Sequence, residues 1–193
     1  MGPGELEEEA RSLRVRAFFG LPVPQPQRDQ LGRFVATCAQ LAPDFRWAPP
    51  ENLHLTLRFV GSIDRPVVEA VADGLSARRL SAFKLRLDGI GTFRRGRAVR
   101  VVWLGLSAGA EEASALAAEV DAECVRAGLV REDRPFQAHL TLARARARDG
   151  ARLADLPAAP LLDPWRAGDL ILYSSRLSRT GAIYEAIRSL PLG

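Results

Sequence analysis

The chain has 193 residues, of which 47% are hydrophobic and 26% are charged, and its formal net charge is +4. This composition is that of a globular protein, long enough for one domain or two small fused lobes with a buried core. Two cysteines are too few for a disulfide framework or a cysteine-rich zinc site, so we expect Cys38 and Cys124 to be buried free thiols of a cytoplasmic protein.

The first half of the chain predicts alternating strands and helices. Residues 1–12 are polar and acidic, typical of a flexible lead-in and unlike a signal peptide or a membrane span. A short apolar run predicts a strand at Val15–Leu21, and apolar residues spaced by three and four predict a helix at Gln27–Leu41. A second helix is predicted at Asp64–Leu75, followed by a half-buried strand at Phe83–Leu87.

The second half repeats this pattern. It predicts a strand at Val99–Leu106, a helix at Ala110–Ala127 and a loop at Arg144–Pro160. Leu170–Tyr173 and Ala182–Ile187 are typical of a closing hairpin. Helices mixed with mostly antiparallel strands indicate the α+β class.

An exact repeat contains both histidines of the chain. His54-Leu55-Thr56-Leu57 and His139-Leu140-Thr141-Leu142 are identical and lie 85 residues apart. Other residues match at the same offset, among them Leu31 with Leu116, Val35 with Val120 and Pro50 with Pro135. The shared register predicts two copies of one supersecondary unit, folded as a single domain over residues 13–193 with two lobes.

A His-x-Thr sequence on a strand places both polar side chains on one face, because residues two apart point the same way. If the two copies meet about a pseudo-twofold axis, two imidazoles and two hydroxyls line one cleft. Such a site suits attack at phosphorus: one neutral imidazole takes a proton and one imidazolium gives one, each worth about 10²–10⁴-fold in rate. The threonines can donate hydrogen bonds to phosphate oxygens, and no metal or cofactor is required.

Other interpretations of the two motifs are weaker. One His-x-Thr alone would favour a solvent-facing strand edge or a hydrogen-bonded interior pair over a catalytic site, but two exact copies favour the catalytic interpretation. Two histidines could hold zinc, but no cysteine or carboxylate has the spacing of a further ligand. A Gly-x-Ser-x-Gly elbow, a P-loop and a dinucleotide fingerprint are all absent from the sequence.

The two histidine contexts resemble those of the 2H phosphoesterase superfamily, and their surroundings resemble its branch of LigT-like RNA 2′,3′-cyclic phosphodiesterases. The resemblance lies in the stretches Arg16–Leu21, Arg46–Gly61, Arg134–Arg144 and Leu172–Leu177, which occur in the family's order. It implies a bilobal fold with the active cleft between two antiparallel sheets.

The resemblance also implies an activity and its residues. The reaction would be metal-independent hydrolysis of a 2′,3′-cyclic phosphate, on RNA ends or nucleotides, to a 2′-phosphomonoester. His54 would be the proton donor and His139 the proton acceptor, although the near-symmetry of the site allows the reverse. Thr56, Thr141 and Arg144 would bind the phosphate. The protein would be a monomer that needs no cofactor and no obligate protein partner and does not associate with a membrane.

Three questions stay open at this point. Arg144 lies five residues after His139, so on a regular strand it would face away from the site unless the strand bulges or ends. Phe136 could stack on a base or pack in the core, and the arginines around Gly96 could contact RNA or form a solvated turn. Cleavage or ligation of 2′–5′ linkages, another cyclic nucleotide as substrate, and non-catalytic binding of phosphorylated RNA ends are the alternative functions.

Overall fold

The computed structural model describes residues 14–178 and 181–193, so the predicted lead-in at 1–12 lies outside the described residues. In the described part, antiparallel strands join in the order β7-β4-β5-β6-β3-β1-β8-β9, with β2 paired to β6. The strands are β1 (Arg14–Pro22), β2 (Phe45–Trp47), β3 (His54–Asp64), β4 (Phe83–Arg95), β5 (Ala98–Ala108), β6 (Leu140–Ala145), β7 (Trp165–Ala167), β8 (Asp169–Leu177) and β9 (Ala182–Pro191). The helices are α2 (Gln25–Leu41), η1 (Pro50–Asn52), α3 (Arg65–Ser76) and α4 (Ala110–Arg126).

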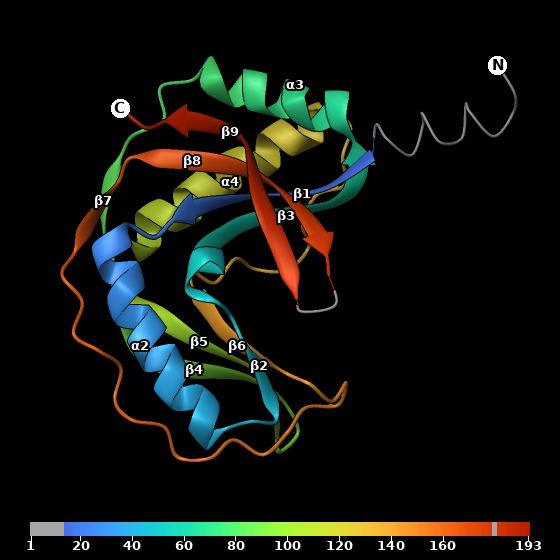
Figure 1. Ribbon diagram of the computed structural model, residues 1–193. Coiled ribbons are helices and arrows are strands. Elements are labelled where there is room, and N and C mark those ends of the chain that lie inside the picture. The colour runs from blue at the N-terminus through green and yellow to red at the C-terminus, as the bar shows by residue number, and fades with distance from the viewer. Residues whose placement is uncertain (1–13, 179–180) are drawn as a thin grey trace, which may run out of the picture.

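The sheet divides into two lobes where β3 meets β6. These strands pair only through Leu55 and Leu140, whereas β1–β3 and β5–β6 pair over longer stretches. One lobe holds β1, β3, β8 and β9 beneath α3 and α4, and the other holds β2, β4, β5, β6 and β7 beside α2 (Figure 1). The predicted bilobal α+β class is therefore confirmed.

The sheet order is symmetric about the β3–β6 junction. Outward from the junction, β3, β1, β8 and β9 on one side match β6, β5, β4 and β7 on the other. The bounds of α2 and α4 differ by 85 residues at both ends. Each of these helices packs in the lobe opposite its preceding strand: α2 contacts β2, and α4 contacts β3. Both lobes therefore contain chain from both copies.

The buried faces follow the predicted apolar spacing. In α2 the buried side chains include Leu31, Phe34, Val35 and Cys38, which are three or four residues apart. Cys38 and Cys124 are free and buried, as predicted, and burial raises the pKa of both thiols to about 11. Both cysteines therefore stay protonated and act as small apolar core residues.

The predicted elements differ from the observed ones mainly at strands. β4 runs to Arg95 instead of Leu87, because it pairs with β5 almost along its whole length. β2 and β7 were not predicted, since three residues carry too little periodicity to detect. No helix among residues 14–178 and 181–193 is long and apolar enough to cross a membrane.

Candidate active site

The β3–β6 junction brings the two histidine motifs together. Leu55 and Leu140 lie opposite each other in the antiparallel ladder, and both are buried. In this register His54 lies beside Thr141, and Thr56 lies beside His139. Since neighbours on a strand point to opposite faces, these four polar side chains share the face opposite the two leucines.

The His54 ring is enclosed by aromatic side chains. It stacks on Phe18 with ring centroids 4.6 Å apart, and the ring of Tyr184 meets it edge-on at 5.1 Å. Its Nδ1 lies 2.7 Å from the Asn52 carbonyl oxygen, and its Nε2 lies 2.9 Å from the Thr56 hydroxyl. The ring is thus fixed at both nitrogens.

The His139 ring has a matching but more open environment. Its Nδ1 lies 2.7 Å from the Gln137 carbonyl oxygen, again two residues earlier in the chain. The Trp103 ring, 85 residues after Phe18, lies 6.0 Å away, and Phe93 meets the imidazole edge-on at 5.0 Å. Phe93 is not repeated in the second copy, where Ser178 is the corresponding position.

The hydrogen bonds define the tautomer of both rings. A carbonyl oxygen can only accept, so each Nδ1 carries the proton and donates it to the backbone. In each neutral ring Nε2 then holds the free lone pair, which in His54 accepts from Thr56. Both rings therefore present the nitrogen that can exchange a proton to the Thr-bearing side of the junction.

Burial and one arginine lower the pKa of both histidines. For His54 the main cause is desolvation, which outweighs the bond to the Asn52 carbonyl, and the pKa is about 4. For His139 desolvation again lowers the pKa. The positive charge of Arg144 contributes in the same direction at both rings.

A bulge in β6 turns Arg144 toward the site. Thr141 pairs with Trp103 of β5 and Ala143 pairs with Val102, so Leu142 is an extra residue. Leu142 and Ala143 are consequently both buried, and Arg144 returns to the face of Thr141. The bulge therefore explains how Arg144, five residues after His139, can face the site.

Five of the six predicted site residues line one cleft of about 870 Å³. Thr56, His139, Thr141, Arg144 and Phe136 all line this cleft. The more enclosed His54 does not line it directly and adjoins it through its hydrogen bond to Thr56. Phe136 also packs against the core, so both of its predicted roles are compatible with its position.

Two further aromatic residues of the cleft were not predicted. Phe93 lines it beside His139, and Phe59, which is 48% exposed, lines it from β3. The offset of 85 pairs Phe59 with Arg144, so this comparison of the two copies could have drawn attention to Phe59.

Arg58 ties the first motif to the segment that leads to the second. Its side chain is only 10% exposed and lies 3.0 Å from Asp121 and 3.1 Å from Glu132. It also donates a 2.6 Å hydrogen bond to the Val130 carbonyl. The chain that leads from α4 to His139 is thus held against β3 by a partly buried charge cluster.

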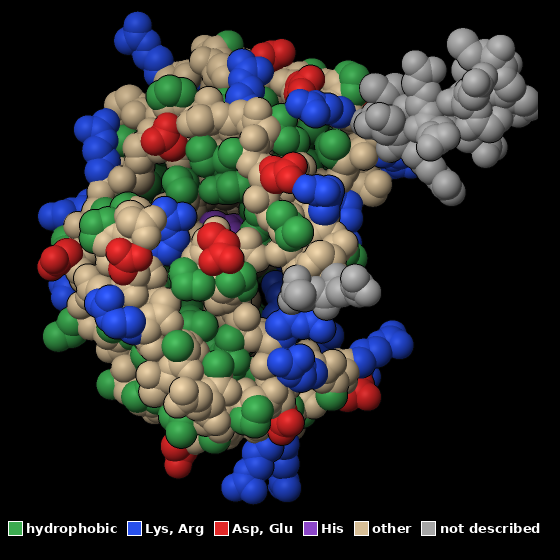
Figure 2. All heavy atoms as spheres, viewed as in Figure 1, with side chains coloured by type: hydrophobic (Ala, Val, Ile, Leu, Met, Phe, Trp, Pro, Cys, Tyr) green, Lys and Arg blue, Asp and Glu red, His purple; other side chains and the backbone are tan. Residues whose placement is uncertain are grey.

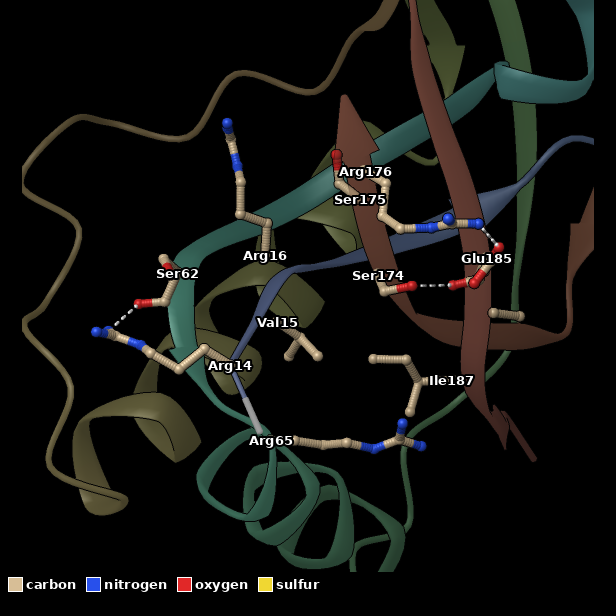
Figure 3. Close-up of a pocket in the computed structure, with 11 residues that line it drawn as sticks. Arg14, Val15, Arg16, Ser62, Arg65, Ser174, Ser175, Arg176, Glu185 and Ile187 are labelled. Carbon is tan, nitrogen blue, oxygen red and sulfur yellow. Dashed lines mark hydrogen bonds and ion pairs between the residues drawn. The ribbon is translucent and has the colours of Figure 1, made fainter. Parts of the chain in front are cut away.

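A second hollow, of about 560 Å³, is lined by residues of β1, β8 and β9 and by Ser62 and Arg65 near the start of α3 (Figure 3). Arg14 reaches the Ser62 carbonyl, and Arg176 and Ser174 both reach Glu185 (Figure 3). No histidine lines this hollow. Three of its four arginines are paired with carboxylates, namely Arg14, Arg65 and Arg176.

Two matched histidines with hydroxyl neighbours lie where the two lobes meet, and each belongs to one copy of the repeat. The LigT like Phosphoesterase family profile matches residues 21–103 and again residues 104–184. The chain belongs to this family, and the resemblance to the 2H phosphoesterases is confirmed.

Named relatives and solved structures agree with this assignment. RNA 2′,3′-cyclic phosphodiesterase from Aeropyrum pernix is 32% identical over 167 residues, which cover 82% of this chain and 92% of that protein. The protein of the same name from Methanothermobacter thermautotrophicus is 32% identical over 180 residues, covering 89% and 96%. The crystal structure of E. coli LigT complexed with 3′-AMP superposes with a TM-score of 0.78 at 26% identity, covering 93% of this chain and 98% of that one.

Proposed function

We propose that this protein hydrolyses 2′,3′-cyclic phosphates at RNA ends, or on nucleotides, to 2′-phosphomonoesters without a metal ion. The observation that carries the proposal is the pair of histidines with the same tautomer, each held by a carbonyl two residues earlier. Paired general acid and base catalysis needs two such rings. The names of the relatives support the cyclic phosphate as the substrate.

The proposed reaction has one displacement at phosphorus. A water molecule attacks the phosphorus while His139 Nε2 takes its proton, so a new P–O bond forms. The bond from phosphorus to O3′ breaks, and His54 Nε2 gives a proton to that oxygen. The products are a 2′-phosphomonoester and a free 3′-hydroxyl, and the two histidines have exchanged protonation states.

Thr56, Thr141 and Arg144 would stabilise the charge that develops on the non-bridging oxygens. Arg144 forms no ion pair with any of the described residues, so its charge is available to an anion. A bound phosphate would offset the positive charge of Arg144 and raise the pKa of both rings. This effect favours protonation of His54, whose pKa of about 4 otherwise keeps it neutral at pH 7.

Metal independence is part of the proposal. No group of three or more His, Cys, Asp or Glu side chains in residues 14–178 and 181–193 is arranged to hold a metal ion. We also propose a cytoplasmic monomer that folds as one domain over residues 13–193. Two buried thiols suit a reducing compartment, and gel filtration tests the monomer.

The test is turnover of adenosine 2′,3′-cyclic phosphate in EDTA, with the product identified as the 2′- or 3′-monophosphate. We expect the 2′ isomer, and we expect His54→Ala and His139→Ala each to lose about 10²–10⁴-fold in kcat. Absence of turnover, dependence on a metal, or turnover that survives His54→Ala would overturn the proposal. Tight binding of phosphorylated RNA ends without cleavage would instead indicate a binding protein.

A further inference from the structure

The positive charge of the protein is concentrated in the cleft. Six arginines and two carboxylates line it, an excess of four positive charges that equals the net charge of the whole chain. Four of the acids that balance the other arginines lie outside the described residues, and within the described residues the cleft carries four of the six excess positive charges. A composition-wide arginine bias does not account for this distribution, because elsewhere in the described residues the basic side chains exceed the acidic ones by only two.

The two walls of the cleft differ in charge. Both carboxylates, Asp121 and Glu132, are engaged by Arg58, and Glu132 also pairs with Arg134. The opposite wall is built by β4, β5, β6 and the segment after β6. Its arginines have no carboxylate partner among the described residues; this arginine wall comprises Arg94, Arg100, Arg144 and Arg148.

A cross-strand pair extends the arginine wall. Arg46 of β2 lies directly opposite Arg144 in the β2–β6 ladder, and both are exposed. Like charges in opposite positions of a sheet destabilise it, and no acid from the described residues neutralises this pair. An anion between the two strands would remove that cost. In Figure 2, several Lys and Arg side chains lie beside the hollow on the lower lobe, and acidic side chains are visible on both lobes.

One cyclic phosphate does not use all of these charges. Arg144 is assigned to the reacting phosphate, which has two non-bridging oxygens, fewer than the four guanidinium groups of the arginine wall. Arg100 adjoins Val101, the residue that pairs with Arg144 in the β5–β6 ladder. Arg148 lies still further along the chain, in the segment after β6. Aromatic residues alternate with these arginines in the cleft, namely Phe59, Phe93 and Phe136. A basic groove with interspersed aromatic side chains is the surface that binds single-stranded nucleic acid.

We infer that the arginine wall and Arg46 bind the phosphodiesters upstream of the cyclic end, so that the enzyme selects oligonucleotide ends over free cyclic mononucleotides. This inference rests on the proposed function and assigns its substrate class. Phosphate contacts of this kind position a strand without reading its sequence. Binding is consequently salt-dependent, with a slope of about 0.7 per neutralised phosphate for a single strand.

The experiment compares two substrates in the wild type and in variants. The substrates are adenosine 2′,3′-cyclic phosphate and a triadenylate that ends in the same cyclic phosphate. The test variant is the double substitution Arg100→Gln with Arg148→Gln, at two exposed positions. The control is Arg95→Gln, because Arg95 is an exposed arginine at the same hairpin but is paired with Asp149.

We expect the wild type to prefer the triadenylate by at least about tenfold in kcat/KM, roughly one good charged contact. The double variant should lose most of this preference through KM, and its salt slope should fall by about 1.4. The control Arg95→Gln should keep both the preference for the triadenylate and the salt slope of the wild type. If the wild type shows no preference, if the double variant keeps it, or if Arg95→Gln loses as much, the inference fails while mononucleotide turnover still supports the proposed function. Loss of turnover on both substrates in the wild type contradicts the proposed function itself.

Discussion

His54 and His139 share a four-residue string, a tautomer and a backbone acceptor, yet they differ in their surroundings. The His54 ring packs against Phe18 and Tyr184 and is hydrogen-bonded to Thr56. His139 is more open, and Thr141 makes no hydrogen bond to it among the described residues. The same local sequence thus produces two rings with different proton affinities, because tertiary neighbours set desolvation.

The copies also differ just beyond the two motifs. Each strand has an extra residue at the second leucine, Leu57 or Leu142, so the following residues change face in the same way. The first copy then presents Phe59 to the cleft, and the second presents Arg144. The symmetric scaffold therefore carries an asymmetric pair, one apolar and one cationic, and only one half supplies the charge for phosphate.

The largest expected effect separates the roles of the two histidines. A substrate with sulfur in place of the leaving O3′ needs little help from an acid, because a thiol is far more acidic than an alcohol. We expect His54→Ala to regain most of its about 10²–10⁴-fold loss on this analogue, while His139→Ala stays inactive. Single-turnover rates of the two variants on the cyclic phosphate and on its sulfur analogue measure this recovery. If the sulfur analogue instead restored the activity of His139→Ala, His139 would be the proton donor and His54 the proton acceptor.

The next effect concerns stability. The pKa of His54 is about 4 when folded against about 6.5 when unfolded, so the unfolded chain binds more protons between these values. The free energy of unfolding should therefore fall as the pH drops from 6.5 to 4, by at most about 3 kcal/mol from this residue. His54→Gln should remove this part of the pH dependence, as measured by urea denaturation at several pH values. His139→Gln is the matched control, and an equal change there would contradict the difference in burial.

Arg144→Met tests the asymmetric pair. Loss of a charged contact to phosphate should lower kcat/KM by about 10–100-fold. Arg144 lowers the pKa of both histidines, so its removal should raise both and move both limbs of the pH–rate profile to higher pH. Phe59→Leu, at the corresponding position of the other copy, should leave the limbs in place. An unchanged pH–rate profile would contradict the prediction that the charge of Arg144 lowers the pKa of both histidines.

The sequence predicted much of this arrangement for a physical reason. The helices and the His-x-Thr faces follow from periodicity, which depends only on local backbone geometry. The helix at Ala110–Ala127 was predicted within one residue, and α2 within two, since it begins just after Pro24. The matched strings also indicated which side chains would meet.

What could not be predicted depends on pairing between distant segments. The bulge at Leu142 is defined by its partners in β5, and without it Arg144 appears to face away. The enclosure of His54 by Tyr184 joins segments 130 residues apart, and Arg58 reaches Asp121 across 63 residues. Strand alternation does not report such contacts, so the difference between the two rings was not visible in the sequence.

The smallest expected effect concerns alanine substitutions at two glycines, Gly91 near the His139 side of the site and Gly20 near His54. A Cβ at Gly91 would lie 2.1–2.4 Å from atoms of the Trp103 ring, so the ring near His139 must move. A Cβ at Gly20 would lie 3.3 Å from Cδ2 of His54 and 3.0 Å from the Leu55 carbonyl oxygen, which requires shifts of only a few tenths of an ångström.

We expect Gly91→Ala to destabilise the protein by about 1–3 kcal/mol through overpacking, measured by urea denaturation. Gly20→Ala should be close to neutral, because the lower entropy of the unfolded chain offsets the crowding by about 0.4–1 kcal/mol. Because Trp103 neighbours His139 and not His54, the Gly91 variant should also shift the pH–rate limb that belongs to the base. If the two substitutions had equal effects, the packing around His54 and His139 would be equally tight. The two imidazoles would then differ only in their burial.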